Sequence, residues 1–149
     1  MTRTYSAKPS DVTRSWYIID AGSDTLGKVA TAAAKLLLGK EKPQFTHHID
    51  TGDFVIIINA SRINVSGAKL QQKRYYRHSG FPGGLHSRTL AEQLERDPTQ
   101  VMLHAVRGML PNNKLLDARL KRLKIYAGSE HPHDPQKRVS ISTKKGKTE

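Results

Sequence analysis

Residues 22–28 have the types and spacing of a phosphate-binding P-loop. Their sequence, GSDTLGK, fits the pattern G-x-x-x-x-G-K between an expected strand and an expected helix, which is the context that a P-loop requires. The next residue is Val29, where a P-loop has a serine or threonine to coordinate magnesium, and the carboxylate of Asp24 would repel phosphate oxygens. We therefore expect no nucleotide hydrolysis. The alternative interpretation is a turn at Gly22, a helix cap at Asp24 and close packing of the helix on the sheet at Gly27.

Four further groups of residues suggest chemistry but lack the partners that it needs. His47-His48 and His131-Pro132-His133 have neither a cysteine partner nor the i, i+4 helical spacing that directs two imidazoles at one metal ion. Asp50 and Asp53 resemble a carboxylate pair, but carboxylates before a buried strand more often hold a loop by accepting backbone N–H bonds. The dipeptide His78-Ser79 has no third catalytic group. We expect no catalytic residue, no cofactor and no metal site, and histidines that lie on the surface or touch RNA.

The strongest signal for binding is the absence of acidic residues between Phe54 and Ala91, because uncompensated positive charge attracts a polyanion such as a nucleic acid. Within Lys73 to Arg77, cations alternate with aromatic rings that could stack on exposed bases, and the glycine-rich loop after it leaves backbone N–H groups bare for phosphate. The alternative is that the tyrosines belong to the core and the charges are simply solvated. The residues of this stretch that we expect to contact RNA are Arg62, Lys69, Lys73, Arg74, Tyr76, Arg77, His78, Gly83, Gly84 and Arg88.

A second basic group lies in the C-terminal third of the chain. A helix capped by Asn112 or Asn113 is expected here, with its leucines turned inward and its cations outward. Taken alone, this basic face could be an ordinary solvated helix surface, but the basic residues beyond it weaken that interpretation. The residues that we expect to contact RNA here are Lys114, Arg119, Lys121, Arg122, Lys124, Lys137 and Arg138.

Composition supports a nucleic-acid-binding protein. The chain has 149 residues, a formal net charge of +12 and an isoelectric point of about 10.1, which is in the range of such domains. It has no cysteine, so disulfides and thiolate metal sites are excluded. No apolar run is long enough for a membrane helix, and the first residues lack the hydrophobic stretch of a secretory signal. We expect a soluble, cytoplasmic protein with no membrane partner and no small-molecule substrate.

The elements that must position these residues indicate an α/β fold. Apolar runs at residues 16–20 and 54–58 predict buried strands, and the helical spacing between them, from Leu26 to Leu37, predicts a crossover helix that ends at Gly39. Strand, helix, strand implies a parallel pair. Residues 62–66 are expected to add a short strand before a basic loop that runs to Gly84. Thr89 with Glu92, and Asp97 with Pro98, are expected to begin two further helices.

We therefore predict a single α/β domain, three-layered as α/β/α around a mainly parallel sheet, with a basic extended loop. Residues 1–13 would be an N-terminal extension, residues 14–127 an RNA-binding core, and residues 128–149 a basic tail that orders only against a partner.

Several motifs occur together in a fixed order: Trp16-x-x-Ile19-Asp20-Ala21, Leu26-Gly27-Lys28-Val29-Ala30, Gly52-Asp53-x-Val55 with Asn59-Ala60, Tyr76-x-His78-Ser79-Gly80-Phe81-Pro82-Gly83-Gly84, Ala105-Val106-x-Gly108-Met109-Leu110-Pro111, and Tyr126-x-Gly128-x-x-His131-Pro132-His133. From about Arg14 to Gln136 the chain thus resembles the large-subunit ribosomal protein thirteen family in its bacterial form. It departs at Asn112, where the family usually has a lysine, at Leu116-Asp117-Ala118, and at Asp134-Pro135.

The resemblance implies a structural constituent of the large ribosomal subunit, located in the ribosome, that binds ribosomal RNA beside neighbouring ribosomal proteins and supports early subunit assembly. It implies no enzymatic activity. The alternatives are a free-standing RNA-binding regulator and a degenerate nucleotide-binding protein that uses residues 22–28.

Overall fold

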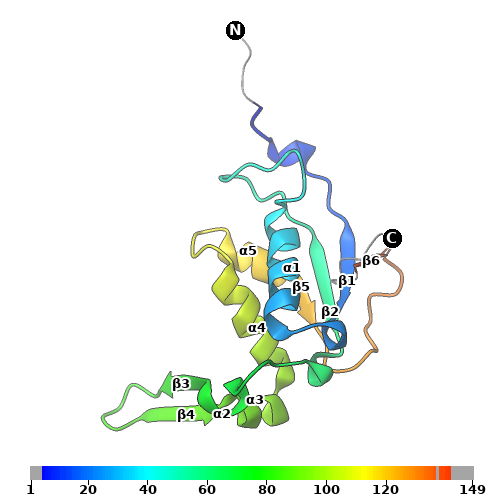
Figure 1. The fold of residues 1–149 in the computed structure, drawn as a ribbon. Helices are drawn as coiled ribbons and strands as arrows, with labels where there is room; N and C mark the ends of the chain where they lie inside the picture. The colour runs from blue at the N-terminus through cyan, green and yellow to red at the C-terminus, as the bar shows by residue number, and fades with distance from the viewer. Residues whose placement is uncertain (1–4, 137, 142–149) are drawn as a thin grey trace.

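A parallel four-stranded sheet forms the centre of the structure, a computed structural model that describes residues 5–136 and 138–141 (Figure 1). Its strands are β1 (Trp16–Asp20), β2 (Phe54–Ile58), β5 (Leu123–Ile125) and β6 (Arg138–Ile141), in the order β5-β2-β1-β6. All three strand pairs are parallel. The predicted class, a single α/β domain around a mainly parallel sheet, is confirmed.

Three helices build the core on one face of this sheet. They are α1 (Leu26–Leu38), α4 (Pro98–Met109) and α5 (Leu116–Lys121), and their apolar residues join Ile19, Val55 and Ile57 in one buried cluster. The uniformly apolar run of β2 is explained by its position, because Val55, Ile56 and Ile57 are all fully buried in the middle of the sheet.

The opposite face of the sheet is covered by residues that follow β5. Trp16 and its neighbour Phe54 stack with ring centroids 4.3 Å apart, and the ring of His133 lies 5.3 Å from Trp16. The hydroxyl of Tyr126 is 2.9 Å from His133 Nε2. The histidines at 131 and 133 therefore pack against aromatic rings of the fold, which corrects the expectation that they lie on the surface.

The segment that resembles a P-loop is an ordinary connection between β1 and α1. A short 3-10 helix, η2 (Ala21–Ser23), makes the turn, and Asp20 caps it by accepting the Gly22 N–H at 2.9 Å. Thr25 stands at the cap position of α1 without a side-chain bond, and Asp24 pairs with Lys28 at 3.6 Å. The expected cap at Asp24 is therefore wrong. So is close packing at Gly27, because a Cβ there would meet no atom within 4 Å.

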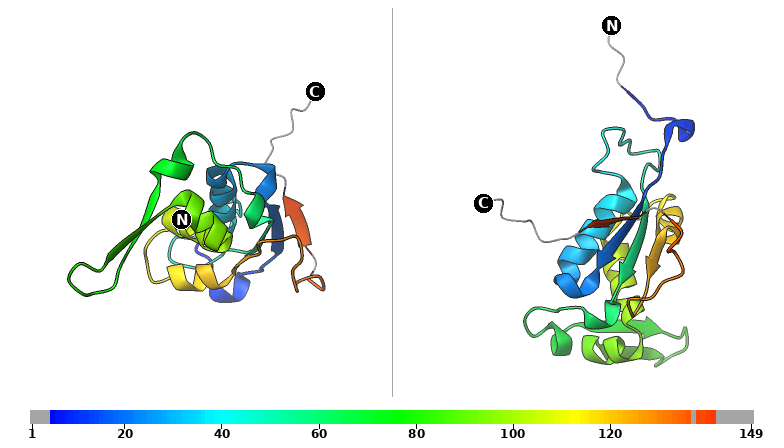
Figure 2. Two further views of the ribbon diagram at one scale, coloured as in Figure 1. Left: turned by 90° about the horizontal axis from the view of Figure 1, so that it is seen from below. Right: turned by 90° about the vertical axis from the view of Figure 1, so that its right-hand side faces the viewer.

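A two-stranded antiparallel hairpin projects from the base of the molecule (Figures 1 and 2). Helix α2 (Lys69–Gln72) leads into β3 (Arg74–His78), which pairs with β4 (Leu85–Thr89). These residues were expected to form an irregular loop, and the structure corrects that prediction. Residues 62–66 were expected to form a strand, but a 3-10 helix, η3 (Ala60–Arg62), and one isolated bridge from Asn64 to Thr25 occur instead.

The predicted starts of the next two helices are confirmed. Thr89 and Glu92 form a complete capping box on α3 (Leu90–Arg96), and Asp97 accepts the Thr99 N–H at 3.0 Å at the start of α4. The helix expected after Asn112 and Asn113 is α5, which begins only at Leu116. Neither asparagine caps it, and the Asn113 side chain accepts the Leu115 N–H.

Both ends of the chain contain structure that was not predicted. A 3-10 helix, η1 (Pro9–Asp11), lies in the N-terminal extension. Residues 138–141 were expected to belong to a tail without structure of its own, yet they pair with β1 as an edge strand of the sheet. Lys137, Lys144, Lys145 and Lys147 lie outside the described residues.

Candidate nucleic-acid interface

The hairpin presents its cations on a regular two-sided frame. Because directly paired residues share a face, Tyr75, Arg77, His86 and Arg88 lie on one side, while Arg74, Tyr76 and His78 lie on the other. All of these side chains except Tyr75 are exposed. Each side of the hairpin therefore offers both positive charge and at least one aromatic or imidazole ring to a ligand.

The two neighbouring tyrosines have different environments. Tyr75 is half-buried, its ring lies 5.7 Å from that of His104 in α4, and burial raises the pKa of its hydroxyl. The ammonium of Lys73 lies 5.4 Å from the centre of the same ring. Tyr76 is 66% exposed. Tyr76 is thus the residue that can stack on an unpaired base, whereas Tyr75 anchors the hairpin to α4.

The tip of the hairpin is a tight turn. The Ser79 N–H donates to Gly84 O at 3.1 Å, the Gly84 N–H donates to Phe81 O at 3.0 Å, and Gly83 has a φ of 71° that favours glycine. Phe81 at the tip is 75% exposed. The glycines have a local folding role, and the turn holds an aromatic ring out from the end of a cationic arm.

A groove of about 790 Å³ separates the hairpin from α3 and α4. Arg77, His86 and Arg88 line it from the hairpin, while Arg96 and His104 line it from the helices. Asp97 is also in this wall, but its carboxylate is engaged in capping α4, and the hydrogen bond from Thr99 holds its pKa below the usual value. The groove is therefore bordered by cations from three different elements.

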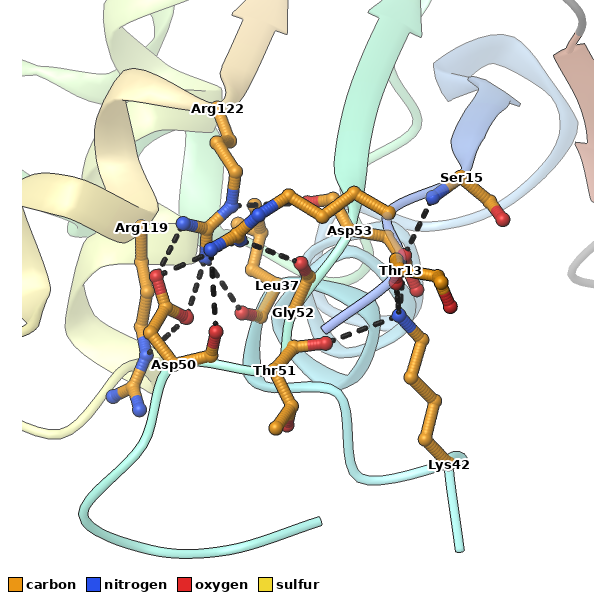
Figure 3. A network of polar contacts seen from close by, with 11 residues as sticks. Thr13, Ser15, Leu37, Lys42, Asp50, Thr51, Gly52, Asp53, Arg119 and Arg122 are labelled. Carbon is orange, nitrogen blue, oxygen red and sulfur yellow. Dashed lines mark hydrogen bonds and ion pairs between the residues drawn. The ribbon is translucent and has the colours of Figure 1, made fainter. Parts of the chain in front are cut away.

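Arg119 and Arg122 do not lie on the surface, which corrects their predicted placement. They are 2% and 7% exposed, and Asp50 is faced by Nε of Arg119 and by the terminal nitrogens of Arg122 (Figure 3). The guanidinium of Arg122 donates to both carboxylate oxygens of Asp50, at 2.7 Å to Oδ1, and to Leu37 O at 3.3 Å. Arg122 is thus a structural residue that ties α5 to the end of α1 and the loop before β2.

Asp50 and Asp53 both organise this loop. Burial alone would raise the pKa of Asp50, but the hydrogen bond and charge of Arg122, with the charges of Arg14 and Arg119, lower it. Asp53 accepts the Ser15 N–H at 2.8 Å and an ammonium N–H of Lys42 at 2.6 Å. The loop-holding role expected for the two carboxylates is found, although Asp50 performs it with arginine side chains. Sequence spacing could not reveal this, because Asp50 and Arg122 are far apart in the chain.

The remaining predicted residues are dispersed over the surface. Arg62, Lys69, Lys114 and Lys121 are exposed, and Lys124 is half-buried in β5. Arg138 lies in β6, but its side chain is outside the described part of the structure, as is the whole of Lys137. The hairpin therefore brings together the predicted group from Lys73 to Arg88, whereas the C-terminal group is divided between surface and core.

Comparison with known proteins identifies the family. Residues 14–132 match the family model described as ribosomal protein L13. The chain belongs to the ribosomal protein L13 family. It is 57% identical over 134 residues to a protein of Kocuria rhizophila named large ribosomal subunit protein uL13, covering 90% of this chain and 91% of the relative.

Two further relatives carry the same name, large ribosomal subunit protein uL13. The one from Mycolicibacterium smegmatis is 55% identical, covering 95% of this chain and 96% of its own. The one from Psychrobacter cryohalolentis is 52% identical, covering 90% and 94%. The family match therefore extends over the sheet strands β1, β2 and β5, the hairpin and the Asp50 network of this chain.

Within the described residues, no group of three histidine or acidic side chains is arranged to hold a metal ion. No helix among them is long and apolar enough to cross a membrane. His47 and His48 are exposed.

Proposed function

We propose that this protein is a structural constituent of the large ribosomal subunit and binds ribosomal RNA through the β3–β4 hairpin. The observation that carries the proposal is an exposed arm from Lys73 to Thr89 with four lysines and arginines, two histidines and no acidic residue. A soluble domain gains no folding stability from such an arm, whereas phosphate groups would neutralise it. Membership of the ribosomal protein L13 family supports the same conclusion.

The geometry favours recognition of RNA shape. Arg74 lies on one side of a thin arm and Arg77 and Arg88 lie on the other, so they can contact phosphates of two RNA segments at once. Tyr76 and Phe81 supply rings that stack on unpaired bases without selecting a sequence. The α/β core of residues 14–127 holds the arm in a fixed direction through Tyr75, α3 and α4. The role is architectural, and it suits a protein that joins the RNA early in subunit assembly and stays in the ribosome beside other ribosomal proteins.

Salt-dependent binding tests the hairpin directly. Replacing Lys73, Arg74 and Arg77 by alanine should lower the magnitude of the slope of log K against log salt by roughly 2–3, because each lost phosphate contact removes about 0.7 to 0.9. Circular dichroism should be unchanged, because these side chains are exposed. The matched variant replaces Lys114, Lys121 and Lys124. If the slope is unchanged for the hairpin variant but reduced for the matched variant, the RNA interface is formed by the C-terminal basic group and the proposal is wrong.

Sedimentation of a cell lysate separates a ribosomal constituent from a free-standing RNA-binding regulator. The proposed function requires that the chain travels with the large subunit, and a chain found only in the light fractions contradicts it.

A further inference from the structure

A cavity of about 280 Å³ is lined by Arg119 of α5 and by residues at or near the ends of α1 and α4. Figure 1 shows α5 well away from the hairpin. Four polar side chains line it: Lys40, His47, Asn113 and Arg119. The other walls, including Leu38 and Phe45, are apolar. Lys40, His47 and Asn113 are exposed at its rim, whereas Arg119 is buried. Two or three potential positive charges thus converge on a hollow that no acidic side chain lines.

Arg119 is buried without the acceptors that its guanidinium needs. It is 2% exposed, and neither its Nε nor its Nη1 has a hydrogen-bond partner. Its closest carboxylate oxygen, Asp50 Oδ1, is 3.7 Å from Nε. Figure 3 shows the two terminal nitrogens turned away from Asp50, with no interaction drawn to them. Leaving charged donors buried and unsatisfied is costly, so the arrangement indicates an acceptor that comes from outside the chain.

The charge balance around Asp50 indicates that this acceptor is an anion. Asp50 forms ion pairs with Arg14, Arg119 and Arg122, and Arg122 already donates to both of its oxygens. One carboxylate therefore faces three guanidinium groups. Arg14 and Arg119 both lie 3.7 Å from it, beyond hydrogen-bonding distance. Arg14 also donates to two backbone carbonyls, whereas Nε and Nη1 of Arg119 have no acceptor. The Asn113 side-chain oxygen accepts the Leu115 N–H at 3.1 Å, which leaves the amide NH₂ as a donor.

We propose that this cavity binds a phosphate group. The phosphate oxygens accept N–H bonds from Arg119 in the interior and from Lys40, His47 and Asn113 at the rim. Charge-assisted bonds from a guanidinium to phosphate are among the strongest that proteins make, and Arg119 is pre-ordered by its burial. The phosphate is either a free anion or one residue of an RNA backbone. Only the RNA source rests on the proposed function.

Equilibrium unfolding of the full chain tests the cavity with inorganic phosphate as the probe. In phosphate titrated against chloride at constant ionic strength, the transition midpoint should rise and saturate as a single site fills. General salting effects of phosphate do not saturate in this way. The double variant Lys40→Ala/His47→Ala should raise the apparent Kd for phosphate at least tenfold. Lys35→Ala, which removes an exposed lysine of α1 outside the cavity, should bind as the unmodified chain does.

The variant Arg119→Met gives a second readout with a defined sign. In chloride it should unfold at the same temperature as the unmodified chain or higher, because an apolar side chain of similar size replaces an incompletely paired buried charge. In saturating phosphate the order should reverse, because only the unmodified chain gains from the anion. If Arg119→Met does not fold, the double variant at the rim decides the question.

The source of the phosphate is distinguished by RNA binding. If it belongs to RNA, Lys40→Ala/His47→Ala should lower the salt slope for a ribosomal RNA fragment by roughly 1–2, and inorganic phosphate should compete with the fragment. Saturable phosphate binding with an unchanged RNA slope supports the same cavity with a free anion.

Two results overturn the proposal. One is that phosphate has no saturable effect on the transition midpoint, or that its effect is as large in Lys40→Ala/His47→Ala as in the unmodified chain. The other is saturation by an acidic peptide under conditions in which phosphate has no effect, which would assign the cavity to a protein partner. Neither result bears on the hairpin, whose own test uses Lys73, Arg74 and Arg77. Likewise, a hairpin variant with an unchanged slope of log K against log salt would not contradict phosphate binding in the cavity.

Discussion

The replacement Asp50→Asn should destabilise the fold far more than the loss of an ordinary surface charge. Among the described residues, Asp50 supplies the one carboxylate that forms an ion pair with Arg122, and it also faces Arg14 and Arg119. Asparagine has nearly the same shape but offers one acceptor in place of two and no charge. Arg122, only 7% exposed, would then keep its charge without a counter-ion.

The expected loss is about 3–5 kcal/mol of unfolding free energy, the range found when one partner of a buried ion pair is removed. The retained bonds from Arg122 to Leu37 O and Asp53 O place the result toward the lower end of that range. Since a domain of this size has a total stability of about 5–15 kcal/mol, the variant should still fold but unfold at a clearly lower urea concentration.

The same replacement should change the response to acid. The pKa of Asp50 is lower in the folded protein than its usual value, so its stabilising contribution is fully present above the unfolded-state pKa of about 3.9. The contribution disappears as the pH falls from there toward the lowered folded-state pKa. The unmodified chain should therefore lose stability more steeply below about pH 4 than Asp50→Asn does.

Urea unfolding at pH 7 and at several lower pH values measures both effects. Glu130→Gln is the matched control, because Glu130 is an exposed carboxylate and its loss should change stability by about 0.5 kcal/mol or less. If Asp50→Asn unfolds within about 0.5 kcal/mol of the unmodified chain, or keeps the same steep acid dependence, then Asp50 does not hold Arg122 in the way described and the reasoning fails.

Two further predictions concern the space beside two glycines and the edge strand β6. Gly52→Ala should destabilise the fold by several kcal/mol or prevent folding, because its Cβ would lie 1.8 Å from Leu37 O. Gly27→Ala should unfold at or above the temperature of the unmodified chain, because its Cβ meets no atom within 4 Å. Thermal unfolding of both variants compares them. Deleting residues 137–149 should lower the melting temperature by roughly 4 °C or more, because it removes β6 from the edge of β1, while deleting only residues 142–149 keeps that strand. Equal melting temperatures for the two truncated chains would show that β6 adds nothing to the sheet.

The parts of the fold that depend on local pattern were predictable. The apolar runs of β1 and β2 fixed the parallel pair, and the capping box of Thr89 and Glu92 and the Asp97-Pro98 start located two helices. In each case the signal lies within a few residues. For the strands it is an apolar run, and for the helix starts it is a side chain that accepts a backbone N–H. The end of α1 at Gly39, in the left-handed conformation, is of the same kind.

The parts that depend on distant partners were not predictable. The hairpin was missed because its strands carry cations and histidines on both sides, so no apolar alternation marks them. Arg119 and Arg122 were predicted to be exposed because arginine on a short helix usually faces water. Their partner Asp50 is distant in the sequence and precedes Arg122 by 72 residues. Strand β6 was missed because it is only four residues long and stands in a polar, basic segment, and because it pairs with the first strand of the chain.

The pairing of β6 with β1 has a consequence for the order in which the protein folds. β1 lies near the beginning of the chain and β6 near its end, so their ladder closes a loop that contains almost every other element. Contacts of such long sequence separation carry the largest loop-closure cost and form late. While the chain is still being synthesised, β1 can pair with β2 on one side only, and its other edge presents unpaired N–H and C=O groups. An open strand edge of this kind can pair with a second chain. The nascent protein is therefore most exposed to misassociation in the interval before β6 emerges.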